Sequence, residues 1–91
     1  MVVITEHAKK HLKEALLAKT HNPDVGFRLV RKSETGKFVL KFDKEREHDQ
    51  VVLHQDSKVL LIDEVMSARP GILTIDFGGR GPYPQLIIVA R

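Results

Sequence analysis

The sequence predicts an α+β domain that is mainly β, and three observations lead to this prediction. One segment, residues 6–19, has apolar residues at helical spacing. Several later segments of four to eight residues are apolar or alternating, and Gly, Pro, Asn, Asp and Ser separate them. No second long helix lies between these segments, so the chain lacks the βαβ alternation of a parallel sheet. We therefore expect one N-terminal amphipathic helix and a set of strands around a shared core.

The helix should begin after Thr5, whose hydroxyl suits an N-cap. Its apolar stripe is expected to pack on the core and consists of Ala8, Leu12, Ala15 and Leu16. Leu17 falls on the polar side of the helix, so it either contacts a later loop or is exposed.

A hairpin is expected next, with strands at residues 25–32 and 36–43 around a turn at residues 33–36. Alternation assigns its two faces. The predicted core face holds Phe27, Leu29, Phe38, Leu40 and Phe42. The opposite face holds Arg28, Val30, Lys32, Lys37, Val39 and Lys41.

The central stretch, residues 58–77, is the most informative part of the chain. Residues 59–62 are continuously apolar and branched, which is typical of a strand covered on both faces. Asp63 is expected to cap one short helical turn at residues 64–68. Pro70 and Gly71 should end that turn, with Gly71 at positive φ, before a strand at residues 72–77.

Three further segments complete the expected order. Residues 51–54 are a short strand, and residues 85–90 are a final apolar strand that should lie inside the sheet. Between residues 77 and 85 we expect an irregular loop, in which Tyr83 either anchors a partner or packs beneath its own loop.

Composition bounds the possible functions. The chain has 91 residues, enough for a single domain over residues 1–91, and a formal charge of +3. It contains no cysteine, which excludes disulfides, thiolate nucleophiles and thiolate metal sites. No segment has the apolar length of a signal peptide or membrane span, so we expect a cytoplasmic protein with no membrane association.

The chain resembles the HesB/IscA-like family, the A-type carriers of iron-sulfur cluster assembly. The resemblance runs nearly full length and is most specific in its central part. It rests on the segments ITEHAKKHLKEAL, VGFRLV, GKFVLKFD, KVLLID and PGILTIDF. It implies a compact, barrel-like β-sandwich with the helix on one side, in a protein that often assembles as dimers or tetramers.

The family's ligand cysteines are missing from this chain. The resemblance implies one cysteine in the loop of the first hairpin and two in a Cys-Gly-Cys tail. The hairpin loop reads Ser33, Glu34, Thr35, Gly36, and no such tail is present in the sequence. Since soft thiolate donors hold cluster iron, we expect this chain to have the family's fold but to bind neither the cluster nor another cofactor.

One candidate metal site lies on the predicted helix. His7, His11 and Glu14 have the i, i+4, i+7 spacing that places two imidazoles and a carboxylate on one face, as zinc or iron would require. The plainer interpretation is that neutral histidines cover apolar neighbours at half-exposed positions. That interpretation is favoured because no distant ligand can be identified.

Two regions of the chain are rich in charged residues. The basic hairpin face, with Arg28, Lys32, Lys37 and Lys41, could meet phosphates. Valines interrupt it and no aromatic residue is available for base stacking, so a solvated face is preferred and the sequence argues against a nucleic-acid partner. The acidic and basic residues at 43–49 lack the spacing of a calcium loop and are interpreted as a solvated loop.

The function expected from the sequence is that of a cysteine-less HesB/IscA-like domain. We expect it to be non-enzymatic and to act in protein binding or regulation, through an unidentified protein partner or through self-association. The alternative from another class is an iron or zinc binding protein that uses His7, His11 and Glu14.

Overall fold

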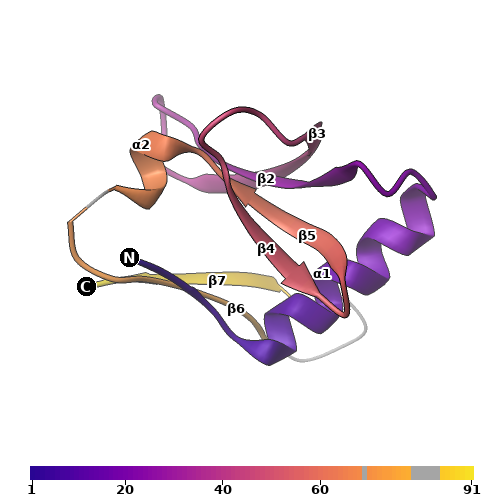
Figure 1. The fold of residues 1–91 in the computed structure, drawn as a ribbon. Coiled ribbons are helices and arrows are strands. Elements are labelled where there is room, and N and C mark those ends of the chain that lie inside the picture. Colours follow the sequence, from indigo (N-terminus) through magenta and orange to yellow (C-terminus); the bar gives the residue numbers. More distant parts are fainter. Residues whose placement is uncertain (69, 79–84) are drawn as a thin grey trace.

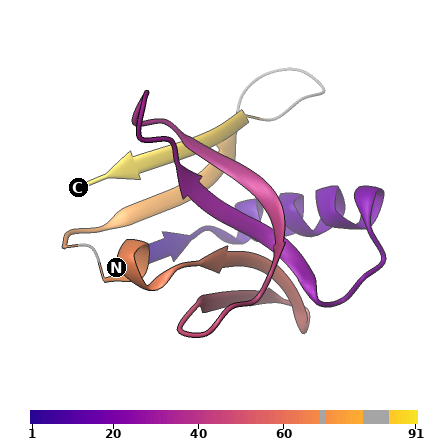
Figure 2. The same cartoon turned by 90° about the horizontal axis from the view of Figure 1, so that it is seen from above.

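A computed structural model describes residues 1–68, 70–78 and 85–91. The elements lie in two β-sheets with a long helix at their side (Figures 1 and 2). In chain order they are β1 (Val2–Ile4), α1 (Glu6–Lys19), β2 (Val25–Arg31), β3 (Phe38–Lys44), β4 (Gln50–His54), β5 (Ser57–Ile62), α2 (Glu64–Ser67), β6 (Leu73–Gly78) and β7 (Gln85–Ala90). The α+β, mainly β class and the N-terminal helix are confirmed.

Both sheets are mixed and open. One has the order β1-β6-β7 and the other β3-β2-β5-β4. β1 runs parallel to β6 and β2 runs parallel to β5, while the other neighbours are antiparallel. The expected barrel-like closure is not found, because closure requires hydrogen-bonded pairing all the way round and each sheet here ends at two edge strands.

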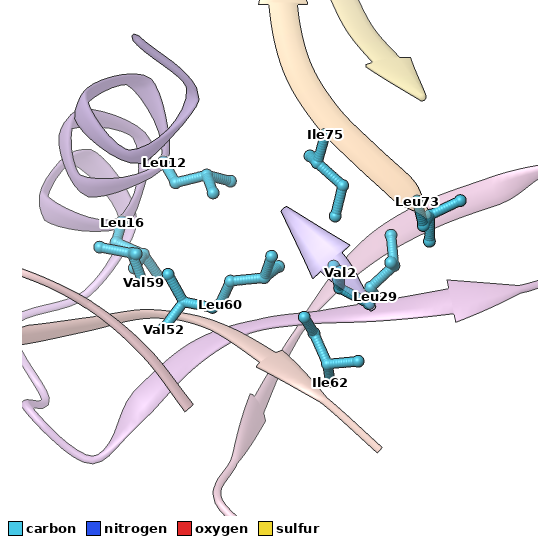
Figure 3. Packing of buried hydrophobic residues seen from close by; sticks show 10 residues of the cluster. All are labelled: Val2, Leu12, Leu16, Leu29, Val52, Val59, Leu60, Ile62, Leu73 and Ile75. Atoms are coloured by element: carbon cyan, nitrogen blue, oxygen red, sulfur yellow. The ribbon is translucent and has the colours of Figure 1, made fainter. Parts of the chain in front are cut away.

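The core lies between the two sheets and α1 (Figure 3). Val2, Leu73 and Ile75 come from the three-stranded sheet, and Leu12 and Leu16 come from α1. The four-stranded sheet contributes Leu29, Val52, Val59, Leu60 and Ile62. A register shift in the β4–β5 ladder lets the adjacent Val59 and Leu60 both reach this core.

The start of α1 is fixed to β6. The Thr5 hydroxyl oxygen accepts a hydrogen bond from the Ala8 amide at 3.1 Å, which confirms the predicted N-cap. The same hydroxyl donates to Asp76 at 2.7 Å, and the Thr5 amide donates to the Ile75 carbonyl at 3.1 Å. Ala15 is exposed rather than buried, because the core is reached only by Ala8, Leu12 and Leu16.

The connection from β5 to β6 brings both ends of the chain together. The Asp63 carboxylate accepts from the Met66 amide at 2.7 Å and caps α2, as predicted. Gly71 has φ +87°, also as predicted, and its carbonyl accepts from the Met1 ammonium at 2.8 Å. Ile72 and Arg91 exchange two backbone hydrogen bonds of 2.8 Å. The residues beside Gly71 therefore join β1, β6 and β7.

One element was not expected from the sequence, and two expectations about individual elements need correction. Residues 2–4 form a strand that the sequence pattern did not indicate, since three residues suffice when β6 is already in place. Phe42 is 47% exposed, although it stacks on Phe27 with ring centroids 5.0 Å apart, because β3 is an edge strand with a neighbour on one side only.

The second correction concerns β7, which lies at the edge of its sheet rather than inside it. Its outward residues Ile87 and Val89 are more than 40% exposed, while Leu86 and Ile88 pack against the core. Tyr83 and the rest of residues 79–84 lie outside the described residues.

Candidate functional site

The two helix histidines lie together at the junction of α1 and β6. Their ring centroids are 4.5 Å apart in an edge-on arrangement, and the His11 ring lies 5.8 Å from that of Phe77. His7 is exposed and His11 is half-buried. This position agrees with the interpretation in which one histidine partly covers an apolar neighbour.

Asp76 is a neighbour of this pair that sequence reasoning missed. The Thr5 hydroxyl, hydrogen-bonded to its carboxylate, holds the pKa of Asp76 below its usual value. The Phe77 amide and the charges of His7 and His11 lower that pKa further. No sequence spacing could have joined residue 76 to the helix, because their proximity comes from the anchoring of Thr5 on β6.

Glu14 is exposed on α1, and no hydrogen bond or ion pair links it to either histidine. Within residues 1–68, 70–78 and 85–91, no three His, Asp or Glu side chains are grouped so as to hold a metal ion. The metal site at His7, His11 and Glu14 stays a prediction for titration to test.

Arg28 does not belong to an exposed basic face. It is 3% exposed, and its guanidinium donates to Asp43 at 2.7 Å and to both carboxylate oxygens of Asp49 at 2.9 and 2.5 Å. Its Nη2 atom also donates to the Lys44 carbonyl at 3.2 Å. The preferred interpretation, a solvated face, is therefore wrong for Arg28. The alternative of phosphate contact is also ruled out for this residue, because its donors are already used within the chain.

This ion-pair network shifts the titration of all three groups. Hydrogen bonds from Arg28 hold the pKa of Asp43 and of Asp49 below the usual range, and Asp49 raises the pKa of Arg28. The Asp49 side chain is 2% exposed, so its charge depends on Arg28 for compensation.

The loop after β3 is consequently ordered around Arg28. The Arg46 amide donates to Asp49 at 2.7 Å, and the Arg46 guanidinium pairs with Asp43 at 2.9 Å. The interpretation of residues 43–49 as a merely solvated loop is corrected by these contacts. A signal was present in the sequence, since an arginine placed in an otherwise apolar strand needs acidic partners.

A hollow of about 320 Å³ opens at the far end of α1. It lies between the second half of α1, the connection from α1 to β2 and the turn from β4 to β5. Leu17 and Leu53 line it and are 56% and 52% exposed. Sequence reasoning left Leu17 open between a loop contact and exposure, and did not single out Leu53.

The described residues contain no helix of the length and apolarity needed to cross a membrane. Comparison with solved structures finds Escherichia coli SufA, a protein described as involved in the biosynthesis of iron-sulfur clusters. The match covers 98% of this chain and 84% of that one, with a TM-score of 0.73 and 22% sequence identity. The chain has a SufA-like fold. No family model and no curated protein sequence matches it.

The SufA-like fold agrees with the resemblance noted in the sequence, because the same arrangement of helix and strands was expected from it. For function, what matters is that this fold occurs here together with the absence of cysteine. A fold found in an iron-sulfur assembly protein is here built from a chain with no cysteine.

Proposed function

We propose that this chain is a cysteine-less relative of the HesB/IscA-like carriers, which works in the cytoplasm by binding another protein. The observation that carries the proposal is the SufA-like fold over 98% of a chain that has no cysteine. The scaffold is retained while the soft ligands of cluster iron are absent. A fold that lacks the thiolate ligands of a cluster can still bind partner proteins through its surface.

The ligand chemistry supports this proposal. Iron-sulfur clusters are held by thiolates, with histidine as the usual replacement at a minority of positions. The sulfur-containing side chains of this chain are two methionines, whose thioethers are weak ligands. Cluster carriage by the chain alone would therefore need imidazole and carboxylate ligands throughout.

The causes of the pKa shifts in this structure also support a non-enzymatic role. The pKa of Arg28 is raised and those of Asp43, Asp49 and Asp76 are lowered, in each case by hydrogen bonds within a structural contact. Ion-pair networks shift pKa values without catalysis, and this one is used to order a loop. The shifts thus have a structural explanation that requires no substrate.

Anaerobic reconstitution with iron and sulfide tests the loss of cluster carriage. The protein should remain colourless after gel filtration, since sulfur-to-iron charge transfer gives a bound cluster its visible absorption. A stoichiometric coloured species would overturn the proposal and show that other ligands replace the thiolates. Protein binding is tested by affinity purification of the tagged chain, followed by binding measurements with each purified candidate.

Iron or zinc binding through His7, His11 and Glu14 is the second candidate function. The observation in its favour is the 4.5 Å separation of the two imidazole rings on α1. Calorimetric titration should then show one metal ion per chain, with binding lost in His11→Ala and retained in the matched control His48→Ala. Titration without stoichiometric binding would remove this candidate and leave the protein-binding proposal in place.

A further inference from the structure

The hollow at the end of α1 has the dimensions and lining of a binding site. Its volume of about 320 Å³ falls at the lower end of the range of ligand pockets, about 300–1,000 Å³. The helix contributes Leu16 and Leu17, and the strands contribute Val25 and Leu53. Leu16 is buried, so the floor is apolar and continuous with the core.

Two large apolar side chains remain in water at this site. Leu17 is 56% exposed and Leu53 is 52% exposed, although they come from different elements. Single exposed leucines are common on protein surfaces, but two that line one concavity form an apolar patch with a shape. Their remaining surface would be removed from water by an apolar group placed in the hollow.

The wall that carries Leu53 is held in a fixed conformation. The turn between β4 and β5 places Gln55 at φ 50° and Asp56 at φ 64°, a left-handed pair that glycine or asparagine would adopt more readily. The Gln55 side chain accepts a hydrogen bond of 2.8 Å from the Lys13 ammonium of α1. The hollow is thus formed before any ligand arrives, which lowers the entropic cost of binding.

Among the charged side chains that line the hollow and have no ion-pair partner in the described part of the chain, most are negative. Of the two lysines that line the hollow, Lys58 is paired with Glu45 at 3.3 Å, whereas Lys13 donates to the neutral amide oxygen of Gln55 and keeps its positive charge. Asp24 and Asp56 also line it, and both are exposed with no ion pair to any described residue. A cationic group would therefore find unpaired carboxylates here, on a chain whose overall charge is +3.

We propose that this hollow binds a segment of a partner protein in which an apolar side chain lies close to a lysine or arginine. The apolar side chain inserts between Leu17 and Leu53. The basic side chain pairs with Asp24 or Asp56 at the rim. This inference rests on the proposed protein-binding function and specifies its site and the chemistry of the partner.

Selection of phage-displayed random heptapeptides against the immobilised full chain tests the proposal. The enriched peptides should carry a branched or aromatic apolar residue within two positions of lysine or arginine. The best peptide, synthesised with blocked ends, is then measured by fluorescence anisotropy. Its amide chemical-shift changes on the ¹⁵N-labelled protein should centre on Leu17, Thr20, Leu53 and Ser57.

Substitutions at exposed positions should keep the fold, and they separate the apolar contribution to peptide binding from the electrostatic one. Leu17→Ser and Leu53→Ser should each weaken peptide binding at least about tenfold, because each removes one apolar wall. Asp24→Asn and Asp56→Asn should each weaken it about threefold and reduce its salt dependence. Asparagine tolerates the positive φ of residue 56, so the turn is retained.

Val65→Ser is the matched control, since Val65 is 83% exposed on α2 and does not line this hollow. It should leave binding unchanged. Failure to enrich any peptide, or enrichment of acidic peptides, would overturn the proposed site and its chemistry. Peptides that bind Leu17→Ser and Leu53→Ser as tightly as the original chain would overturn the site but leave protein binding intact. The part of the proposed function that says the chain holds no iron-sulfur cluster is tested separately, by anaerobic reconstitution with iron and sulfide.

Discussion

Substitution of Gly71 by valine should be among the most damaging single changes in this chain. Gly71 has φ +87°, where a β-branched residue is strongly disfavoured. A Cβ atom added at this position would also collide with the carbonyl oxygen of Arg91. Relief of that collision requires the end of β7 to move away from Ile72.

The expected loss of stability has two parts. The left-handed conformation alone costs a non-glycine residue about 1–2 kcal/mol. Movement of Arg91 breaks its two hydrogen bonds with Ile72, each with a net contribution of about 1 kcal/mol. Gly71→Val should therefore lower the free energy of unfolding by about 3–4 kcal/mol, a large share of the roughly 5–15 kcal/mol typical of a domain.

Gly36 provides the matched control. It has φ +70°, but a Cβ atom there would meet only the Arg31 side chain, at an ordinary contact distance of 3.6 Å. Gly36→Val should thus show the conformational cost without the collision. Urea denaturation of both variants, followed by circular dichroism, measures the difference. Equal losses would refute the role of Arg91, and an unchanged Gly71→Val midpoint would refute the whole explanation.

Three further outcomes are expected. Because the folded-state pKa values of Asp43 and Asp49 are lowered, the stability that their ionised carboxylates contribute is complete above about pH 4 and is lost as the pH falls through those folded-state values. In thermal melts from pH 6 to 2.5, the melting temperature of Arg28→Met should therefore fall less than that of the original chain. Ile88→Ala should cost about 2 kcal/mol in urea denaturation and Ile87→Ala less than about 1 kcal/mol, since only Ile88 packs on the core; equal costs would contradict the assigned faces of β7. A chelator such as EDTA should leave the melting temperature unchanged, because the core is apolar and closed without metal; a drop in melting temperature would indicate a structural metal.

Much of the secondary structure was accessible from local sequence. The bounds of α1 were predicted because Thr5 caps it and Ala8, Leu12 and Leu16 repeat at helical spacing. The Asp63 cap and the positive φ of Gly71 followed from side-chain chemistry and backbone sterics that act within a few residues. The antiparallel hairpin of β2 and β3 was predicted as well, because a short turn joins its strands. The other sheet partners did not follow, because strands separated by many residues carry no local mark of which neighbour they pair with.

Less of the candidate site than of the fold could be predicted from the sequence. The proximity of His7 and His11 follows from helix geometry, but Asp76 joins them only because Thr5 is anchored on β6. Alternation assigned Arg28 to the outer face of the hairpin, and solvation was then assumed. The structure shows instead that Asp49 and the loop after β3 cover it.

The sequence by itself determined the fold class, the helix and its cap, the short α2 and the absence of thiolate chemistry, since these depend on composition and on interactions between near neighbours. The tertiary structure decided the pairing of β1 with β6, the edge position of β7, the burial of Arg28 and the hollow between Leu17 and Leu53. Each of these joins segments distant in the chain. Their free energies depend on what packs against them, which a local pattern does not contain.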